Sequence, residues 1–313
     1  MFIHLHWHST FSFLEAIGKP AKIAARAKEL GMSSIAITDY NGMFGAIKFF
    51  QACKDEWIKP IIWVELGFVL DVSSANPVDY IWNIVLLAKT TKWYSSLLEL
   101  TSYANTLWVK DKPKIDLTAL RDFFDWVICF FGWTESWIGK MILRDEPREK
   151  IIEIVRMLQS ILGENAVYWE IISQLHSENK NLERVNNYVF DLCQELGIWC
   201  IVNPNYHYIK KTDKEAWEVA LAVKDAKKIY DNDRRQPKGE YYIMKKEDVV
   251  EILEKNWYTL GQIEKMISNN LMLAESFDVD IALWQVLFPN YESPESILET
   301  YEKVKNNLIE NID

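Results

Sequence analysis

The sequence of 313 residues contains little cysteine and glycine and no long apolar run. Its four cysteines show no Cys-x-x-Cys spacing and stand mostly in apolar contexts, which indicates reduced core residues of a cytoplasmic protein. No apolar segment approaches the roughly 20 residues that cross a membrane. The start also lacks the basic and apolar regions of a signal peptide. We therefore expect a cytoplasmic globular protein with no membrane partner.

Basic residues are also in deficit, because the net charge is −10. This charge argues against a surface that coats nucleic acid. It is compatible with a small cleft in which a metal ion screens carboxylates from a phosphate. The length suits one large α/β domain or two ordinary ones.

The shortage of glycine coincides with an excess of tryptophan, 11 Gly against 14 Trp. Trp57, Trp93 and Trp257 stand at predicted helix ends and turns, where Gly supplies the positive φ that such positions often need. Our hypothesis is that many of these Trp, with Trp7 as a further candidate, are UGA codons that the source translates as Gly. The alternative is that they are genuine core or interface aromatics.

Short apolar strands alternate with helices over the first 200 residues. Strands are predicted at 2–8, 33–38, 59–68, 83–88, 126–131, 166–172 and 199–202. The intervening helices are predicted at 19–30, 44–53, 94–104, 148–162 and 182–196. This alternation predicts a parallel sheet, and seven strands in about 200 residues favour closure into a barrel.

Only helices are predicted beyond the last strand, at 213–224, 246–253 and 260–274. The stretch 281–294 has the composition of a linker, and 295–309 is predicted to be an amphipathic helix.

Three of the five histidines lie within the first eight residues, as His4, His6 and His8. Residues two apart on a strand point to the same face. Since imidazole is the commonest metal ligand at neutral pH, His6 and His8 can reach one ion, with His4 one step further back. The alternative interpretation is a polar patch at the start of the chain.

Other polar residues stand at the ends of later predicted strands. Asp39 ends the second strand, Glu65 lies late in the third, and His207 follows the last. In parallel α/β barrels the site forms at the carboxyl ends of the strands. We therefore expect these residues to share one cavity with His6 and His8.

The segments that carry these residues resemble the PHP (polymerase and histidinol phosphatase) domain family. The resemblance is closest to the PHP domain at the N-terminus of the alpha subunit of bacterial DNA polymerase III. The matching segments are 4–9 (HLHWHS), 31–45 (GMSSIAITDYNGMFG), 58–65 (IKPIIWVE), 85–100 (VLLAKTTKWYSSLLEL), 112–117 (KPKIDL) and 203–208 (NPNYHY). The MFGA and LLAK strings point to the polymerase branch of the family.

The resemblance implies an α/β fold, a distorted (β/α)7 barrel with a C-terminal helical extension. Residues 1–280 would form the PHP domain, and residues 281–313 a linker and helix toward a missing polymerase palm. It also implies phosphoester hydrolysis, seen in some members as 3′–5′ exonuclease activity, with up to three divalent metal ions. Mixed His and carboxylate ligation suits Zn, Mn or Fe.

Carried over residue by residue, the resemblance assigns six metal ligands: His6, His8, Glu15, Glu65, His176 and His207. The weakest match is His176, because the spacing there carries an insertion. At the GxE motif that contains Glu65, Trp63 stands in place of Gly. Asp39 is the catalytic candidate and would order a water molecule or a ligand imidazole. His4 lies outside the HxH pair, either behind the ligands or as a core histidine.

Two departures from the family pattern weaken the implied site. The family's TDH is Thr38-Asp39-Tyr40, so a ligand His has become Tyr40, and the family's DxH is Asn205-Tyr206-His207, so a carboxylate has become an amide. Because metal affinity depends on anionic and imidazole ligands, we expect fewer than three ions.

The sequence is compatible with three functions. The first is a metal-dependent phosphoesterase of the 3′–5′ exonuclease kind, whose partner would be single-stranded or primer-end DNA. The second is a non-catalytic module that docks a polymerase core or a proofreading subunit. The third is a small-molecule phosphatase of the histidinol-phosphate type. Polymerisation itself is not expected, because no pair of catalytic aspartates with a surrounding palm is recognisable.

Overall fold

The computed structural model describes the chain except residues 71–81, 107–112, 123–127, 284–294 and 311–313. The chain divides into two compact units, residues 1–281 and residues 282–313. The second unit contains helix α11 (Glu295–Glu310), and most of the predicted linker at 281–294 lies outside the described residues. No helix among the described residues is long and apolar enough to cross a membrane.

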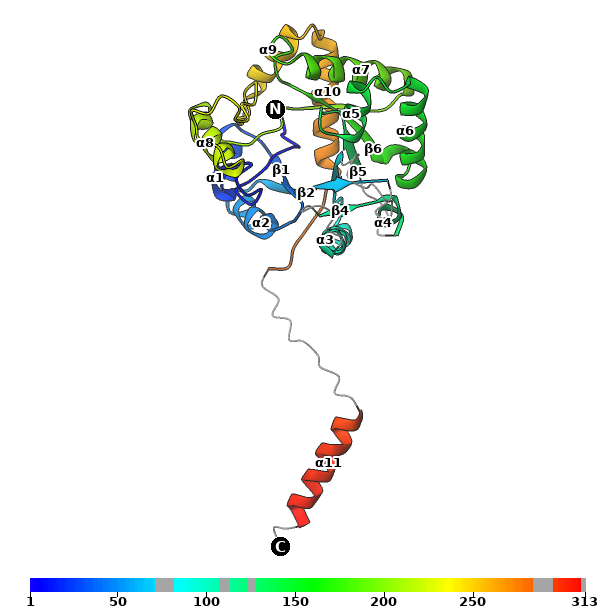
Figure 1. The fold of residues 1–313 in the computed structure, drawn as a ribbon. Coiled ribbons are helices and arrows are strands. Elements are labelled where there is room, and N and C mark those ends of the chain that lie inside the picture. Colours follow the sequence, from blue (N-terminus) through cyan, green and yellow to red (C-terminus); the bar gives the residue numbers. More distant parts are fainter. Residues whose placement is uncertain (71–81, 107–112, 123–127, 284–294, 311–313) are drawn as a thin grey trace. The chain divides into compact units, whose positions relative to one another are not determined.

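The first unit contains all the strands, with helices arranged around them (Figure 1). The strands are β1 (Ser34–Tyr40), β2 (Lys59–Phe68), β3 (Trp82–Leu87), β4 (Lys114–Ile115), β5 (Ile128–Phe131), β6 (Val167–Ile172) and β7 (Cys200–Asn203). The helices are α1 (Pro20–Glu29), α2 (Ala46–Asp55), α3 (Thr91–Thr106), α4 (Leu117–Asp122), α5 (Trp137–Leu143), α6 (Arg148–Leu162), α7 (Lys180–Leu196), α8 (Lys214–Lys224), α9 (Lys246–Lys255) and α10 (Leu260–Glu275).

The observed strands agree with those predicted from residue 33 onward to within two residues, apart from residues 126 and 127, which lie outside the described part. The predicted α/β fold is therefore confirmed. The strand β4 and the helices α4 and α5 were not predicted, because each is too short to show a periodic pattern.

The strands form one mixed sheet in the order β1-β2-β3-β5-β6-β7, with β4 paired to β2. The strand β3 runs antiparallel to both β2 and β5, and the other pairs are parallel. In the parallel pair β1–β2, Tyr40 is in register with Glu65, so the end of β1 lies beside a carboxylate of β2.

The N-terminal segment, residues 2–8, joins the two ends of this sheet. Trp7 forms a parallel bridge with Tyr206, three residues after β7. On its other side, the amide of Thr38 in β1 donates to the carbonyl oxygen of Trp7 at 2.6 Å. The hydrogen bonds therefore run around a ring, in agreement with the barrel-like arrangement that the alternating pattern favoured.

The prediction of a regular strand at 2–8 is nevertheless wrong, because the segment is bulged. The amides of Ala36 and Thr38, two residues apart on β1, donate to His4 and Trp7, which are three residues apart. One extra residue breaks the two-residue alternation of side chains. His4 consequently does not join His6 and His8, and its Nε2 lies 2.8 Å from the carbonyl oxygen of Met244. His4 is thus a buried core histidine, bonded through Nε2, whose Nδ1 has no hydrogen-bond partner among the described residues.

Two asparagine side chains replace backbone pairing between this segment and β7. Asn203 Oδ1 accepts from the amide of Leu5 at 2.9 Å. Asn270 of α10 donates to the carbonyl oxygens of Ile3 (3.1 Å) and Val202 (2.7 Å). These amides satisfy buried backbone groups that a regular ladder would otherwise pair.

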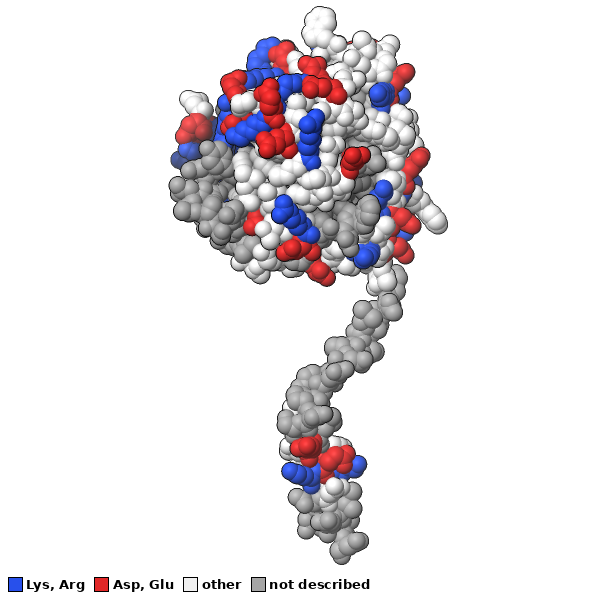
Figure 2. All heavy atoms as spheres, turned by 90° about the vertical axis from the view of Figure 1, so that its right-hand side faces the viewer, with Lys and Arg blue, Asp and Glu red and all other residues white. Residues whose placement is uncertain are grey.

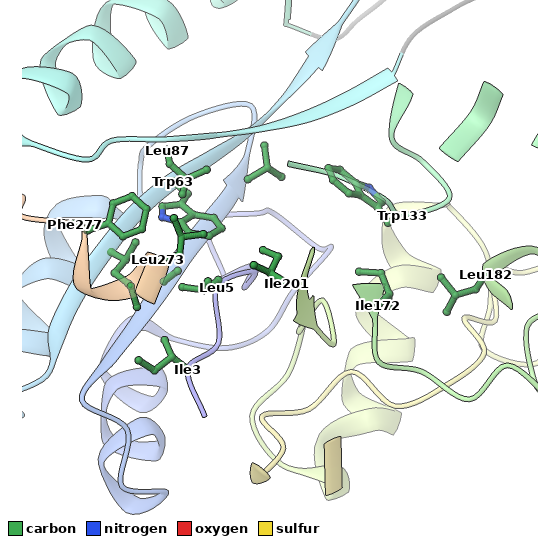
Figure 3. Close-up of a cluster of buried hydrophobic side chains, with 14 residues drawn as sticks. Ile3, Leu5, Trp63, Leu87, Trp133, Ile172, Leu182, Ile201, Leu273 and Phe277 are labelled. Atoms are coloured by element: carbon green, nitrogen blue, oxygen red, sulfur yellow. The ribbon is translucent and has the colours of Figure 1, made fainter. Parts of the chain in front are cut away.

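Residues from near the start and near the end of the first unit belong to one buried hydrophobic cluster (Figure 3). Leu5 of the N-terminal segment and Trp63 of β2 belong to the same buried cluster as Leu273 and Phe277, at and just beyond the end of α10. Trp63 is 1 % exposed, so the residue at the family's Gly position is a packed core residue here.

Two of the tryptophans proposed to be misread glycines stand at helix ends where glycine is favoured. Trp57 follows α2 with φ 59°, Trp257 follows α9 with φ 71°, and each is 91 % exposed. In both cases the next amide donates to the carbonyl oxygen five residues earlier, as it does after Gly31 at the end of α1. This is the Schellman geometry, in which the left-handed residue is usually Gly. Trp93 differs, since it lies half-buried in the first turn of α3.

The substitutions Trp57→Gly and Trp257→Gly are each expected to stabilise the protein by about 1 kcal/mol, because a left-handed non-glycine residue costs roughly 1–2 kcal/mol. The matched control is Trp93→Gly inside α3, which should instead cost about 1 kcal/mol or more. Urea unfolding of the three variants measures these differences. Mass spectrometry of the protein from its source tests the UGA hypothesis itself: intact Trp at positions 57 and 257 would end it.

Candidate metal centre

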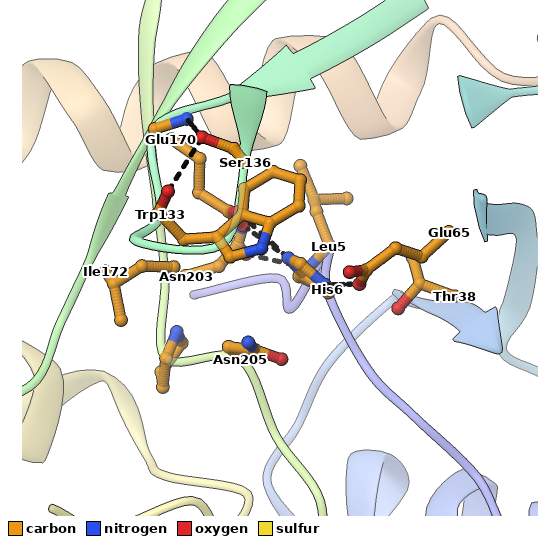
Figure 4. Close-up of polar contacts among 12 residues, drawn as sticks. Leu5, His6, Thr38, Glu65, Trp133, Ser136, Glu170, Ile172, Asn203 and Asn205 are labelled. Carbon is orange, nitrogen blue, oxygen red and sulfur yellow. Dashed lines mark hydrogen bonds and ion pairs between the residues drawn. The ribbon is translucent and has the colours of Figure 1, made fainter. Parts of the chain in front are cut away.

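Three side chains from two parts of the chain meet at the carboxyl-end rim of the strands. His6 and His8 come from the N-terminal segment and Glu65 from β2, and all three are buried. One ligand atom of each lies within 4.8 Å of the others. His6 Nε2 is 3.1 Å from Glu65 Oε2 (Figure 4). His8 Nε2 is 3.4 Å from the same oxygen.

The Glu65 carboxylate is held in place by its neighbour on β3. Asn83 Nδ2 donates to Glu65 Oε1 at 2.6 Å, which leaves Oε2 for the two histidines. The strand pairing explains this contact, because Asn83 pairs with Gly67, two residues beyond Glu65 on the same strand. Side chains two apart share a face of the sheet.

A second buried carboxylate, Glu170 of β6, binds the other side of His6. Its Oε2 lies 2.9 Å and its Oε1 3.1 Å from His6 Nδ1, and Asn203 Nδ2 donates to Oε1 at 2.8 Å. The Nδ1 proton of His6 is therefore donated to Glu170, so that Nε2 faces Glu65. Such a carboxylate partner fixes the tautomer and orientation of a ligating histidine.

Glu170 was missed from the sequence. The signal that could have found it is a single acidic residue inside the otherwise apolar stretch 167–172, because a buried charge on a strand requires a partner.

Burial and charge act on these groups in opposite directions. Burial disfavours the charged form of His6, but Glu170 and Glu65 outweigh it and raise the pKa of His6 to about 10. The pKa of Glu65 is also raised, because burial outweighs the opposing effect of His6. His8 has a pKa well below its ordinary value because of burial and its histidine neighbours. In the metal-free site the positive charge therefore resides on His6 rather than on His8.

The cluster fits a divalent metal ion. Two imidazoles and one carboxylate form a donor set that suits Zn, Mn or Fe. Neither ring nitrogen of His8 makes a hydrogen bond of good geometry among the described residues, and the same holds for the buried Asn205 Oδ1. Buried polar atoms without partners are rare in folded proteins, and a bound ion would satisfy the histidine nitrogen that faces Glu65.

His207 and Tyr40 flank His8. The ring centre of His207 lies 4.8 Å from that of His8, and the ring of Tyr40 stacks on His8 at 4.0 Å. Because the ring centres of His6 and His8 are 5.1 Å apart, those of His6 and His207 lie within about 10 Å of each other. His207 Nδ1 donates to the carbonyl oxygen of Asn205 at 3.0 Å.

Three other predicted residues are engaged elsewhere. The Asp39 carboxylate accepts three hydrogen bonds of 2.7 Å, from the amide and hydroxyl of Ser9 and the hydroxyl of Ser12. Glu15 forms ion pairs with two cationic side chains. His176 is buried beside Asn186, with its Nε2 3.0 Å from the Asn186 amide nitrogen, and it is not among the residues that line the neighbouring cavity.

A cavity of about 610 Å³ opens beside the cluster. Glu65 reaches this cavity, whereas His6 and His8 are not among its lining residues. Polar and aromatic side chains dominate the wall, among them Glu15, Tyr40, Asn83, Trp133, Lys140, Asn205, His207, Trp217, Lys224, Arg235 and Tyr241. The candidate ion site therefore borders, through Glu65, a cavity large enough for a small phosphorylated molecule or a chain end.

Comparison with known families gives a match over residues 4–174 to the model described as PHP domain. The chain belongs to the PHP domain family. The resemblance that the HxH and neighbouring segments suggested is thereby confirmed.

Relatives of this PHP domain include much longer proteins. The DNA polymerase III subunit alpha of Borreliella burgdorferi is 29% identical over 299 residues, which cover 94% of this chain and 25% of that protein. The same subunit of Bacillus subtilis is 26% identical, with 94% and 24% covered. The chain thus spans about a quarter of the length of these relatives. A solved two-domain protein from Bacteroides vulgatus, described as containing a predicted PHP-like metal-dependent phosphoesterase, has a TM-score of 0.41 at 14% identity, over 66% of this chain and 52% of that one.

Proposed function

We propose that this PHP domain is a metal-dependent phosphoesterase acting on nucleic-acid 3′ ends, within a protein related to DNA polymerase III subunit alpha. The observation that carries the proposal is the buried group of His6, His8 and Glu65, of which Glu65 lines a polar cavity. A divalent ion bound there would lower the pKa of a water molecule and offset the charge of a phosphodiester.

The residues of the chain have separate tasks in this proposal. His6, His8 and Glu65 would hold the ion through nitrogen and oxygen atoms that lie close to one another. Asn83 and Glu170 keep the carboxylate and the imidazole in these orientations. Asp39 orders the loop after the N-terminal segment through its serine hydrogen bonds, and we assign it a positioning role.

The surface charge favours a local rather than a broad contact with nucleic acid. On the face shown in Figure 2, acidic and basic side chains of residues 1–281 are interspersed. A protein that neutralises many phosphates at once requires a continuous run of Lys and Arg. We therefore infer that the domain would engage the end of a strand, while further DNA contacts would come from other parts of a longer protein.

The direct test is hydrolysis by the purified chain loaded with Mn²⁺ or Zn²⁺. Release of mononucleotides from a 3′-labelled single strand, lost in His8→Ala, would support the exonuclease proposal. Hydrolysis of histidinol phosphate without activity on DNA would favour the small-molecule phosphatase. Absence of both activities in a metal-loaded protein would favour the non-catalytic module.

One observation favours the module as the second candidate. Protonated His6 forms ion pairs with Glu65 and Glu170, so these three side chains stabilise one another without a bound ion. In that function residues 1–280 would be a rigid part of a replicative polymerase, with residues 281–313 leading toward the polymerase core or a proofreading partner.

Metal affinity is expected to rise with pH. The folded pKa of His6, about 10, exceeds its ordinary value of 6.5, so the metal-free protein carries this proton through neutral pH and the ion must displace it. Between about pH 6.5 and about pH 8.5, affinity should increase by up to tenfold per pH unit, because one proton is released per ion. Calorimetry in buffers of different ionisation enthalpy measures that proton, and a pH-independent affinity would contradict the charge assignment.

A further inference from the structure

The carboxylate of Glu15 faces the same cavity as Glu65 but has no oxygen free of a cation. Lys224 Nζ donates to its Oε1 at 2.5 Å, and Arg235 Nη1 donates to its Oε2 at 2.9 Å. The cavity is lined by all four side chains, Glu15, Glu65, Lys224 and Arg235. The Glu15 side chain is 18% exposed, and those of Lys224 and Arg235 are each 40% exposed, so water screens these ion pairs in part.

Lys224 and Arg235 are both held in position by the end of helix α8. Arg235 forms a bidentate pair with Asp225, through Nε (3.0 Å) and Nη2 (3.1 Å). Lys224 is the last residue of α8, directly before Asp225. On the same helix, Trp217 Nε1 donates to the backbone oxygen of Glu15 at 2.6 Å. The end of α8 therefore fixes both the carboxylate and its cations, and bidentate Arg–carboxylate pairs are the most geometrically specific of such contacts.

We propose that Lys224 and Arg235 are built-in counter-ions for Glu15 and take the place of a divalent ion on this side of the cavity. This inference rests on the proposed metal site in one respect. It explains why Glu15, which the family resemblance assigns as a ligand, is not part of that site. A divalent ion placed at Glu15 would meet two positive charges within a few ångströms, and the solvent exposure of Lys224 and Arg235 leaves this repulsion partly screened. On this proposal an ion beside the cavity would be held at His6, His8 and Glu65 and not at Glu15.

The counter-ion proposal predicts a gain of metal binding on removal of the two cations. In the variant Lys224→Ala/Arg235→Ala, Glu15 becomes an unpaired anion, and we expect about one additional Mn²⁺ per chain. The same variant should lose thermal stability in metal-free buffer and recover part of that loss when Mn²⁺ is added, because binding to the folded state stabilises it. The parent should show a smaller Mn²⁺-dependent shift.

Two controls separate this effect from a general change of charge. Lys227→Ala/Arg234→Ala removes the same charge from two neighbouring ion pairs that do not line the cavity, and it should bind as much Mn²⁺ as the parent does. Adding Glu15→Gln to the first variant should abolish the additional ion.

The outcomes distinguish this proposal from the proposed function. A parent that binds no Mn²⁺ contradicts the His6 site but leaves the additional ion of the variant testable. A Lys224→Ala/Arg235→Ala variant whose Mn²⁺ content equals that of the parent overturns the counter-ion proposal. Gain of the ion in a Glu15→Gln background would overturn it as well.

Discussion

Replacing Glu170 by alanine is expected to destabilise the protein by about 3–5 kcal/mol, the usual cost of removing one partner of a buried ion pair. The physical reason is that His6 is raised to a pKa of about 10 largely by this carboxylate and has no water to replace it. The milder change Glu170→Gln keeps the shape and should lower metal affinity by about 10–100-fold.

Chemical unfolding and Mn²⁺ titration measure the two effects of Glu170. The matched control is Glu195→Gln, which removes an exposed carboxylate paired with Arg148 and should cost about 1 kcal/mol or less. If Glu170→Gln binds Mn²⁺ as tightly as the parent, Glu170 does not position His6, and its burial has only a structural role.

The double variant Tyr40→His/Asn205→Asp is expected to raise bound metal from about one to about two ions per chain. Burial raises the pKa of Tyr40 well above its ordinary value, so its phenol stays protonated and is a poor ligand. Asn205 offers an oxygen without charge, and that oxygen is buried without a partner. Imidazole and carboxylate at these positions would supply the missing donors beside His8 and His207.

Elemental analysis and the single-strand hydrolysis rate measure this gain, which should appear in both. The control Tyr40→Phe retains the stacking on His8, seen at 4.0 Å, but adds no ligand. No increase of Zn or Mn in the double variant would mean that the cavity has changed beyond these two side chains. The non-catalytic module would then be the better interpretation.

Local patterns predicted most of the fold. The strand β2 and the helix α6 have the predicted bounds, 59–68 and 148–162, because each is a long run with one clear periodicity. The N-terminal segment deviates because its pairing depends on Asn203 and Asn270, which are about 200 and 270 residues away in sequence. No local pattern contains such partners.

The candidate site was also predictable only in part, because some of its contacts follow from local patterns and others join residues distant in sequence. His6, His8 and Glu65 stand at predicted strand positions whose spacing places them at one rim, and the structure brings them together. Glu170 lies 164 residues from His6 in sequence, so its contact follows only from the order of the strands in the sheet. The cations at Glu15 come from the end of α8 and the loop after it, where sequence shows only ordinary surface charges.

The most direct test of the metal centre is the metal content of the freshly purified chain compared with that of His8→Ala. The parent is expected to hold about one divalent ion per chain, and the variant, with one of three ligands removed, close to none. Elemental analysis at neutral pH gives both values. A parent without metal after incubation with Zn²⁺ and Mn²⁺, or a metal content unchanged by His8→Ala, would contradict an ion site at His6, His8 and Glu65.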